Sequence, residues 1–269
     1  MLHRFHVEEI GDWERVRLPR QTVHHLHVLG LSAGSEVVLF DGTGCEVLAR
    51  IESMSSAEAQ ALILRRTHRG DPQTQSSALG DPREASLDVT IACAVPKGRR
   101  MDTLVRACAE LGVGRIVPLI TRRSVVKPGE RSRGPQAREI ASGDLRPSRK
   151  MDRWRKICVA ASEQSGRNRI TSVEPPATLP DFLKRTPDFD LAVILSPEGS
   201  AATLASLLAP YDRLASLVIL VGPEGGFTDE ELELAARHGL RTARLTRSIL
   251  RVETACIAAA AVALMHVTA

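Results

Sequence analysis

Two short loops rich in glycine and proline are the places where this sequence could hold a ligand. Residues 196–199 read Ser-Pro-Glu-Gly after the apolar run 191–195, and residues 222–227 read Gly-Pro-Glu-Gly-Gly-Phe after the apolar run 217–221. Glycines let the backbone approach a bound molecule without interference from a Cβ. The second loop lacks the Lys-Ser/Thr of a Walker A phosphate loop and the GxGxxG spacing of a dinucleotide fold. Either loop alone is also compatible with an ordinary turn that leaves a strand.

The apolar runs before these loops predict strands of a parallel sheet, and the residues after the second loop predict a helix. Thr228 and Glu231 form the capping box of that helix, in which each side chain satisfies a free backbone donor. A third segment, residues 245–255, enters an alanine-rich final helix. Open α/β sheets bind ligands at the carboxyl ends of their strands. We therefore expect a ligand site at these loops.

The chain from Leu87 onward alternates strands and helices. Helices are predicted around residues 101–111 and 154–162. Strands are predicted at residues 89–95, 116–120, 191–195, 217–221 and 242–245. Strands that are apolar on both faces belong to a parallel sheet covered by helices, so this part predicts an α/β domain over residues 88–269.

Residues 1–70 predict a small β-barrel instead. Residues 37–40 and 46–51 form a hairpin signal around the turn 41–44, whose glycines allow the positive φ that a tight turn needs. The polar residues 71–87 contain turn-forming residues and no apolar period, which is typical of a domain linker. The sequence therefore predicts two domains joined by a linker.

The composition is that of a globular protein with an uneven distribution of charge. The chain has 269 residues, of which 43% are hydrophobic and 25% charged, so a disordered or fibrous chain is excluded. Its net charge is +4, but residues 121–156 hold twelve Lys or Arg against four Asp or Glu. Such a segment attracts a polyanion such as RNA, and a solvated surface loop is the other interpretation. Only 3% of the residues are aromatic, so base stacking is not expected to dominate recognition.

The five cysteines indicate neither a disulfide framework nor a zinc site. They are scattered without a CxxC pair, and His24, His25 and His27 lack a further ligand at zinc spacing. The longest apolar stretch, residues 255–267, is shorter than a membrane span, and the first residues are too polar for a signal peptide. We expect a protein of the reducing cytoplasm with no bound metal and no membrane partner.

The motifs and their order establish a family resemblance. The loop at 222–227, followed by Ile-Leu-Arg at 249–251 and Glu-Thr-Ala at 253–255, resembles the SPOUT-class RNA methyltransferases, specifically those that methylate N3 of a uridine in 16S ribosomal RNA. Further matching stretches lie in the right order at residues 4–5, 39–42, 101–102, 110–113, 122–125 and 163–167. The resemblance therefore covers nearly the whole chain.

This resemblance implies an N-terminal PUA-like RNA-binding β-barrel and a C-terminal α/β SPOUT domain, whose last strands and helix form a deep trefoil knot. It implies that S-adenosyl-L-methionine is the cofactor and lies among three knot loops, and that the chain forms a homodimer through the knot domain. The implied substrate is 16S rRNA of the small ribosomal subunit, methylated at uridine 1498. The implied cofactor residues are Leu195, Ser196, Pro197, Leu220, Gly222, Pro223, Glu224, Gly225, Leu245, Ser248, Ile249, Leu250 and Arg251.

The resemblance also directs attention to charged residues that methylation of uracil N3 would use. The reaction needs a proton acceptor near N3 and a cation near the flanking oxygens. Glu253 and Arg251 are the candidates for these two roles. The alternative interpretation is a local structural role, in which Glu253 favours the helix N-terminus and Arg251 pairs with it. The candidate RNA ligands are Arg4, Arg122, Arg123 and Arg167.

Three places depart from the family's usual pattern. Residues 246–248 are Thr-Arg-Ser where Gly-Pro-Arg or similar is usual, Val252 replaces a threonine, and Gly30 replaces a frequent arginine. The last change removes one expected RNA contact. Two alternative functions therefore stay open: a catalytically idle knot protein that serves as an RNA-binding assembly factor, and a knot enzyme that methylates ribose or guanine.

Overall fold

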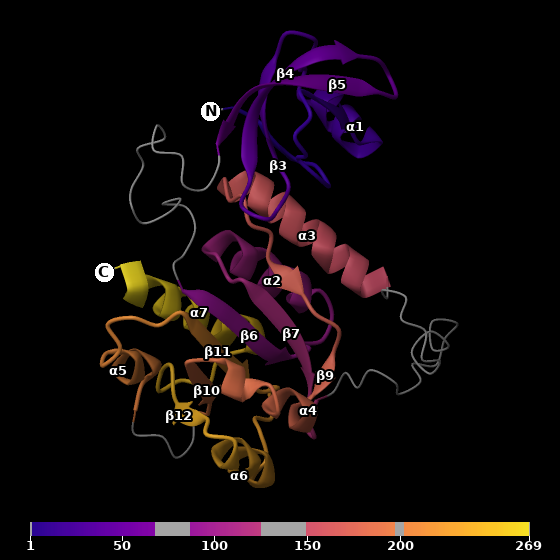
Figure 1. Cartoon of the computed structure of the whole chain (residues 1–269). Coiled ribbons are helices and arrows are strands. Elements are labelled where there is room, and N and C mark those ends of the chain that lie inside the picture. Colours follow the sequence, from indigo (N-terminus) through magenta and orange to yellow (C-terminus); the bar gives the residue numbers. More distant parts are fainter. Residues whose placement is uncertain (1, 68–86, 125–148, 197–201, 269) are drawn as a thin grey trace. The chain divides into compact units, whose positions relative to one another are not determined.

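The structure is a computed structural model that describes residues 2–67, 87–124, 149–196 and 202–268 (Figure 1). The chain divides into two compact units. The first comprises Met1–Glu84 and Val159–Ile170, and the second comprises Ala85–Cys158 and Thr171–Ala269. The predicted linker up to residue 86 and residues 125–148 of the basic segment lie outside the described residues.

The first unit contains a five-stranded mixed sheet that forms a half-barrel. Its strands are β1 (Arg4–His6), β2 (Arg15–Leu18), β3 (Glu36–Phe40), β4 (Glu46–Met54) and β5 (Ala59–Thr67), in the order β1-β3-β4-β5-β2. β1 runs parallel to β3, and the other pairs are antiparallel. The predicted hairpin is the β3–β4 pair, and its turn glycines, Gly42 and Gly44, both have positive φ. The prediction of a β module is confirmed.

One helix, α1 (Arg20–Val28), follows β2 and precedes β3 along the chain, and it was not predicted from the sequence. Its buried residues are Thr22, Val23 and Leu26, so its apolar stripe is narrow and the periodic signal weak. Gly30 follows the helix with φ of 69°, a left-handed conformation that favours glycine, and its N–H donates to the carbonyl of His27 at 3.1 Å. The end of α1 therefore gives a local reason for glycine where the family often has arginine.

Residues 159–170 belong to the first unit because they pack along β1 and the β3–β4 turn. The N–H of His6 in β1 donates to Oε1 of Glu163 at 3.0 Å. The N–H of Gly44 in the turn donates to the carbonyl of Asn168 at 3.1 Å. The Glu-Gln-Ser-Gly-Arg motif that this chain shares with the family therefore helps to hold the half-barrel together.

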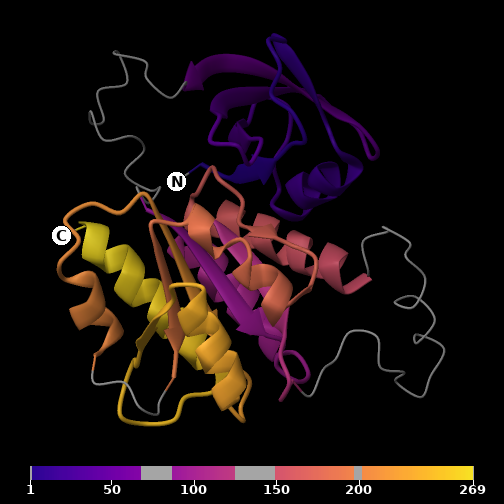
Figure 2. The same ribbon diagram turned by 60° about the horizontal axis from the view of Figure 1, so that its bottom comes forward.

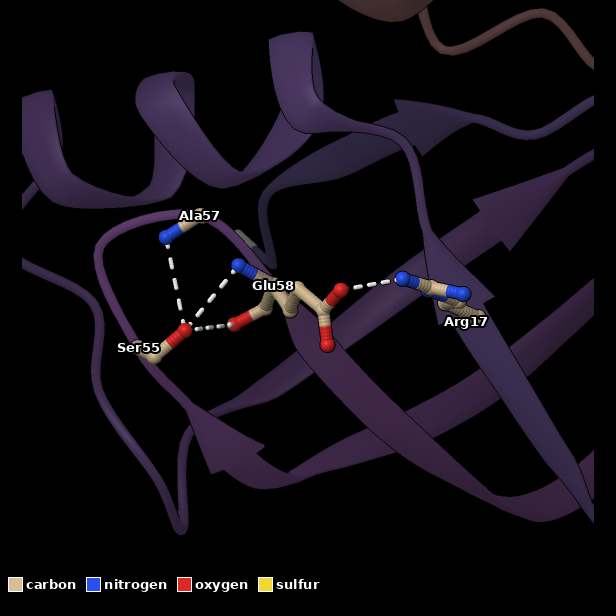
Figure 3. A network of polar contacts seen from close by, with 4 residues as sticks. All are labelled: Arg17, Ser55, Ala57 and Glu58. Atoms are coloured by element: carbon tan, nitrogen blue, oxygen red, sulfur yellow. Dashed lines mark hydrogen bonds and ion pairs between the residues drawn. The ribbon is translucent and has the colours of Figure 1, made fainter.

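The turn between β4 and β5 is fixed by a small polar network (Figure 3). The Ser55 hydroxyl accepts hydrogen bonds from the backbone N–H groups of Ala57 at 3.3 Å and Glu58 at 3.1 Å. The Glu58 carboxylate forms an ion pair with Arg17 of β2, and the other arginine of β2 is paired as well. Exposed ion pairs stabilise a fold only weakly, but these two neutralise the basic side chains of β2.

The second unit is built on a parallel sheet, as the sequence predicts. Its strands are β6 (Asp88–Ala94), β7 (Arg115–Ile120), β8 (Ser172–Val173), β9 (Ala177–Thr178), β10 (Leu191–Leu195), β11 (Ser216–Val221) and β12 (Arg241–Ala243). Their order is β12-β10-β11-β6-β7-β8, and β9 also pairs with β7. All of these pairs are parallel. The carboxyl ends of β10, β11 and β12 therefore lie at the same edge of the sheet.

Helices cover both faces of this sheet. The helices of this unit are α2 (Arg100–Leu111), α4 (Leu179–Leu183), α5 (Leu204–Leu208), α6 (Asp229–Arg237) and α7 (Val252–Thr268), with a 3-10 turn, η2, at Thr186–Asp188. Helix α3 (Arg149–Ser165) begins in this unit, and its residues from Val159 onward belong to the first unit. Phe182 of α4 and Ala235 of α6 share a buried cluster with Ala92 of β6. The next residue along β6, Cys93, points to the opposite face and contacts Cys256 of α7.

The C-terminal chain path returns from the edge of the sheet to its middle. β12 pairs with β10 at the edge, and α7 then packs against α2, α5, β6 and β11 (Figure 2). The family resemblance places the trefoil knot in this return. Among the helices that the structure describes, none is long and apolar enough to cross a lipid bilayer.

Candidate functional site

A cavity opens at the carboxyl ends of β10, β11 and β12. The loops after β11 and β12 supply most of its walls. The lining residues are Leu195, Ser196, Val221, Gly222, Pro223, Glu224, Gly226, Arg244, Leu245, Thr246, Ser248, Ile249, Leu250 and Ala255.

The cavity brings together most of the residues that the family resemblance assigns to the cofactor. Three assigned residues do not line it: Leu220 is buried in β11, Gly225 faces Arg123, and Arg251 is exposed. Pro197 lies outside the described residues. The lining residues that the assignment missed are Val221, Gly226, Arg244, Thr246 and Ala255. All of these except Ala255 are next to an assigned residue in the sequence. Extending each assigned stretch by one residue would have included them.

Phe227 and two glycines shape the loop after β11. The Phe227 ring is 7% exposed and packs over Gly222, where a Cβ would lie 3.0 Å from two ring atoms. Gly226 has φ of 69°, and its N–H donates to the carbonyl of Pro223 at 2.8 Å, which closes a tight turn. The loop therefore needs glycine at two positions for two different reasons.

Glu231 connects this loop to the end of β7. The predicted capping box is confirmed, since the Glu231 carboxylate accepts from the N–H of Thr228 at 2.9 Å and the Thr228 hydroxyl accepts from the N–H of Glu231 at 3.3 Å. The other Glu231 oxygen accepts from the backbone N–H of Arg122 at 2.8 Å. One buried carboxylate therefore holds both the start of α6 and the chain that follows β7.

Arg122 and Arg123, both candidate RNA ligands, have different partners. Nη1 of Arg123 donates to the carbonyls of Gly225 at 2.6 Å and Phe227 at 3.4 Å. Nη1 of Arg122 lies 3.7 Å from Oε2 of Glu230, and both of these side chains are 69% exposed. Arg122 is therefore a surface cation, whereas Arg123 contacts the loop that lines the cavity.

Arg100, at the start of α2, joins two acidic residues of the site, and the sequence analysis missed it. Its Nη1 lies 3.4 Å from Oε1 of Glu224, and its Nε lies 3.8 Å from Oε1 of Glu253. The Glu253 side chain is 13% exposed, and its Oε2 has no hydrogen-bond partner among the described residues. Glu253 is thus a carboxylate held beside a cation, and its second oxygen is buried without a hydrogen-bond partner among the described residues.

Arg251 lies just before α7, and its carbonyl accepts from the N–H of Ala255 at 2.8 Å. Its side chain is exposed and forms no ion pair with any other residue that the structure describes. The ion-pair partner of Glu253 is Arg100, so the two candidate catalytic residues do not neutralise each other.

Two buried cysteines, Cys108 and Cys256, offer no reactive thiolate to this site. Cys93, Cys108, Cys158 and Cys256 are buried, and none of them forms a disulfide. Burial raises the pKa of Cys108 and of Cys256, and a hydrogen bond with Cys93 raises that of Cys256 further. These two thiols therefore stay protonated at neutral pH. Within the described ranges, no group of three or more His, Cys, Asp or Glu side chains is arranged to hold a metal ion.

Arg4 and Arg167, the other candidate RNA ligands, are buried in the first unit. The Arg4 side chain is 9% exposed, and its Nη2 lies 2.9 Å from Oε2 of Glu46 and 3.4 Å from the carbonyl of Arg167. Its guanidinium also lies over the Phe40 ring, 5.2 Å from the centroid. Both arginine side chains are therefore largely shielded from solvent within the first unit, and their direct contact with RNA stays a prediction.

The cavity suits a molecule with an apolar part and a positively charged part. Leu195, Leu245 and Leu250 supply apolar walls, and the glycines of the loop after β11 expose backbone groups. The Glu224 carboxylate on the wall carries a negative charge, which Arg100 at 3.4 Å partly compensates. Arg251 and Glu253 bring a cation and a proton acceptor to the start of α7, next to the cavity.

Comparison with known proteins defines the class. The family model described as RNA methyltransferase domain matches residues 83–264, and the model described as RNA methyltransferase PUA domain matches residues 18–64. The chain therefore belongs to the RNA methyltransferase family that carries an N-terminal PUA domain.

Relatives in this family are named Ribosomal RNA small subunit methyltransferase E. The protein of that name from Bacillus subtilis (strain 168) is 28% identical over 253 residues, which are 92% of this chain and 89% of the relative. The crystal structure of the Neisseria gonorrhoeae protein of that name, bound to S-adenosyl methionine, is 30% identical with a TM-score of 0.79, covering 97% of this chain and 96% of that one.

A methyltransferase structure from Legionella pneumophila, in complex with bound S-adenosyl methionine, is similar to the same extent. It is 29% identical with a TM-score of 0.77 and covers 97% of this chain and 96% of that one. These comparisons confirm the predicted family and its fold class, a PUA-like barrel joined to a SPOUT-type parallel-sheet domain.

Proposed function

We propose that this chain is an S-adenosyl-L-methionine-dependent methyltransferase that methylates N3 of a uridine in 16S ribosomal RNA, at uridine 1498, during ribosome biogenesis. The relatives named for the small ribosomal subunit support the rRNA substrate. The observation that carries the proposal is the cavity at three neighbouring strand ends, in a chain that matches S-adenosyl-methionine-bound relatives over nearly its whole length. The N3 position and the particular uridine rest on the motif resemblance.

The cavity fits S-adenosyl-L-methionine, which supplies an activated methyl group when bound. Its leucine walls suit an adenine ring, and the exposed backbone of Gly222 and Gly226 suits polar groups that need donors and acceptors. The carboxylate of Glu224 complements the positive charge that the sulfonium and the amino group carry. The residues that would hold the cofactor are therefore the lining residues of the loops after β10, β11 and β12.

Arg251 and Glu253 would act on the uracil. Removal of the N3 proton spreads negative charge to the flanking oxygens, which a cation stabilises. The Arg251 guanidinium is exposed and has no ion-pair partner among the described residues, so it is available for this charge. Glu253 would accept the proton, and Arg100 pairs with one of its oxygens.

RNA would bind to both units. Arg122 is the best-placed candidate because its side chain is 69% exposed at the end of β7, where the basic segment begins. Arg4, Arg123 and Arg167 are the remaining candidates from the sequence. The PUA domain match supports an RNA-binding role for the half-barrel.

The chain would act in the cytoplasm as a homodimer that forms through the knot domain. Ile249, on the cavity wall, is 82% exposed, and Met265 of α7 is 70% exposed. Isolated exposed apolar side chains do not by themselves mark an interface, so the homodimer rests on the family resemblance. Light scattering after gel filtration should give twice the mass of the chain, whereas a monomer at micromolar concentration would contradict this part of the proposal.

The alternatives make different predictions for two measurements. Calorimetry should give a binding heat with S-adenosyl-L-methionine, and an idle assembly factor would give none. Mass spectrometry of 16S rRNA from cells that lack the gene should show loss of N3-methyluridine at the target. An unchanged N3-methyluridine signal would contradict the proposal, and loss of a methyl group from ribose or guanine would favour the related knot enzymes.

A further inference from the structure

The Arg123 side chain spans the loop between Gly222 and Phe227 from outside the cavity. Its Nη1 contacts two carbonyls of that loop, those of Gly225 at 2.6 Å and Phe227 at 3.4 Å. A Cβ on Gly225 would lie 3.4 Å from Cδ of Arg123, so the stem of the arginine packs against the same loop. Hydrogen bonds from a charged donor are among the stronger ones in proteins.

The backbone that carries Arg123 is fixed independently. Ser124 and Thr121 close a buried turn, in which the N–H of Thr121 donates to Oγ of Ser124 at 3.0 Å and the N–H of Ser124 donates to the carbonyl of Thr121 at 3.2 Å. The N–H of Arg122 is held by Glu231, which is 6% exposed. The backbone at Arg123 is therefore fixed by its neighbours, and the contacts of the guanidinium are not needed to order it.

The contacts of Arg123 determine which backbone groups of the loop point outward. The Gly225 carbonyl faces the guanidinium, and the N–H of the same peptide unit, on Gly226, donates to the Pro223 carbonyl. The whole peptide unit is therefore oriented, while Gly222, Pro223, Glu224 and Gly226 line the cavity. Arg123 does not itself line the cavity.

We infer that Arg123 is a positioning residue for the cofactor, which it serves by holding the loop after β11 in the shape that binds S-adenosyl-L-methionine. This inference rests on the proposed function for the identity of the ligand. It gives Arg123 a role different from the RNA contact that its place in the basic segment suggests. Arg122, one residue earlier, keeps the role of surface cation.

The test compares Arg123→Ala and Arg123→Lys with Arg237→Ala, which removes an exposed arginine of α6 that pairs only with Glu233 in the described structure. Calorimetry below the melting temperature of each variant should show S-adenosyl-L-methionine binding about tenfold weaker for Arg123→Ala, a loss typical of one charge-assisted hydrogen bond. Arg123→Lys should regain part of the affinity because an ammonium can still donate to one carbonyl. Arg237→Ala should bind as the unchanged chain does.

Two further readouts separate a positioning role from other roles. Hydrogen exchange without cofactor should be faster at residues 222–228 of Arg123→Ala than in the unchanged chain, and this holds whether or not the proposed ligand is correct. The salt dependence of RNA binding should be unaltered. Unchanged cofactor affinity together with a salt slope reduced by about one unit would overturn the inference and make Arg123 an RNA ligand.

If the unchanged chain gives no heat with S-adenosyl-L-methionine, the proposed function fails. The exchange measurement then still decides whether Arg123 holds the loop. Equal exchange at residues 222–228 in Arg123→Ala and the unchanged chain would overturn the inference even if the cofactor binds. Lower melting temperature alone, with cofactor affinity and exchange both retained, would likewise reduce Arg123 to a stabilising residue.

Discussion

The loops after β11 and β12 face the same cavity, but the structure holds them in different ways. The first is fixed from outside by Arg123 and by Glu231 and packs Phe227 against Gly222. In the second, residues 245–251, the one side-chain hydrogen bond within the described structure joins Oγ1 of Thr246 to the carbonyl of Ser248 at 2.8 Å. Most of this second loop is exposed, with Ile249 at 82%.

This difference shows where the chain tolerates sequence change. The residues that depart from the family's usual pattern, 246–248, lie in the loop that few contacts constrain. The Gly-Pro-Glu-Gly-Gly-Phe motif lies in the loop whose backbone is bonded on several sides. A substitution lowers stability most where a rigidly held neighbour has to move. We therefore expect mutations in the loop after β11 to have larger effects than mutations in the loop after β12.

The largest effect is expected from Gly222→Val. Its Cβ would lie 3.0 Å from two Phe227 ring atoms and 3.3 Å from the Phe227 nitrogen, so the ring and the loop must shift. Overpacking of this kind costs about 1–3 kcal/mol, and a displaced loop should weaken cofactor binding by roughly a hundredfold. Calorimetry and a melting curve on the same preparation measure the two effects.

The control for Gly222→Val is the double variant with Phe227→Leu, which removes the ring that the new side chain meets. Partial recovery of cofactor affinity in the double variant is expected. If Gly222→Val alone binds the cofactor normally while folded, then the packing of Phe227 on Gly222 does not shape the site.

The next effect is expected in the less constrained loop, from Arg251→Ala. If Arg251 stabilises charge on the uracil, turnover should fall by about a hundredfold, the size of effect seen when one charge-stabilising donor is removed. Cofactor affinity should change much less, because Arg251 does not line the cavity. Single-turnover methylation and calorimetry give the two values.

Arg247→Ala is the matched control, since it removes an exposed arginine of the same loop that neither lines the cavity nor precedes α7 directly. Its turnover should stay within about twofold of the unchanged chain, as for most surface substitutions. Equal losses of turnover and affinity in Arg251→Ala would mark Arg251 as part of the pocket scaffold.

A smaller effect is expected from Arg122→Glu. This substitution changes the residue next to Arg123, which holds the loop after β11. The Arg122 guanidinium is exposed and bonded only to Glu230 in the described structure, so cofactor affinity should be retained. RNA binding should weaken several-fold at low salt, with the slope against log salt reduced by about one unit. Filter binding over a salt series would measure this, and an unaltered slope would exclude Arg122 from the RNA surface.

The smallest effect is expected from Thr246→Ala. It removes the hydrogen bond to the Ser248 carbonyl, which lies at an exposed position where water can replace it. We expect less than about a twofold change in cofactor affinity, in line with surface substitutions in general. A loss as large as that of Gly222→Val would show that the two loops are equally constrained and would contradict the comparison above.

The longer elements of the second unit were predictable because their signals are local, whereas the short elements β8, β9, α4 and α5 were not predicted. The run 191–195 is β10 itself, the run 217–221 lies within β11, and the capping box at Thr228 is present as predicted. Boundaries at the ends of elements differ by a few residues, as at β12 and α3. Local patterns were also sufficient to place the candidate cavity, since parallel strands end at one edge.

The contacts that organise the site were not predictable in this way. Arg100 meets Glu253, and Arg123 meets Gly225, across long stretches of chain, and no local spacing encodes either pair. Arg123 was predicted to bind RNA because it lies in a basic segment. The sequence does not show that its guanidinium faces the carbonyl of Gly225. The narrow apolar stripe of α1 was missed for a related reason: Val23 and Leu26 are too few to give a periodic signal.

The position of α7 and β12 late in the chain has a consequence for the order of events during synthesis. A polypeptide emerges from the ribosome at roughly 5–20 residues per second, N-terminus first. The sheet core can be complete before Arg241 is made, but the wall formed by residues 244–250 and Ala255 cannot. A nascent chain that has not yet reached Ala255 therefore lacks part of the pocket wall and cannot hold the cofactor as the finished domain would.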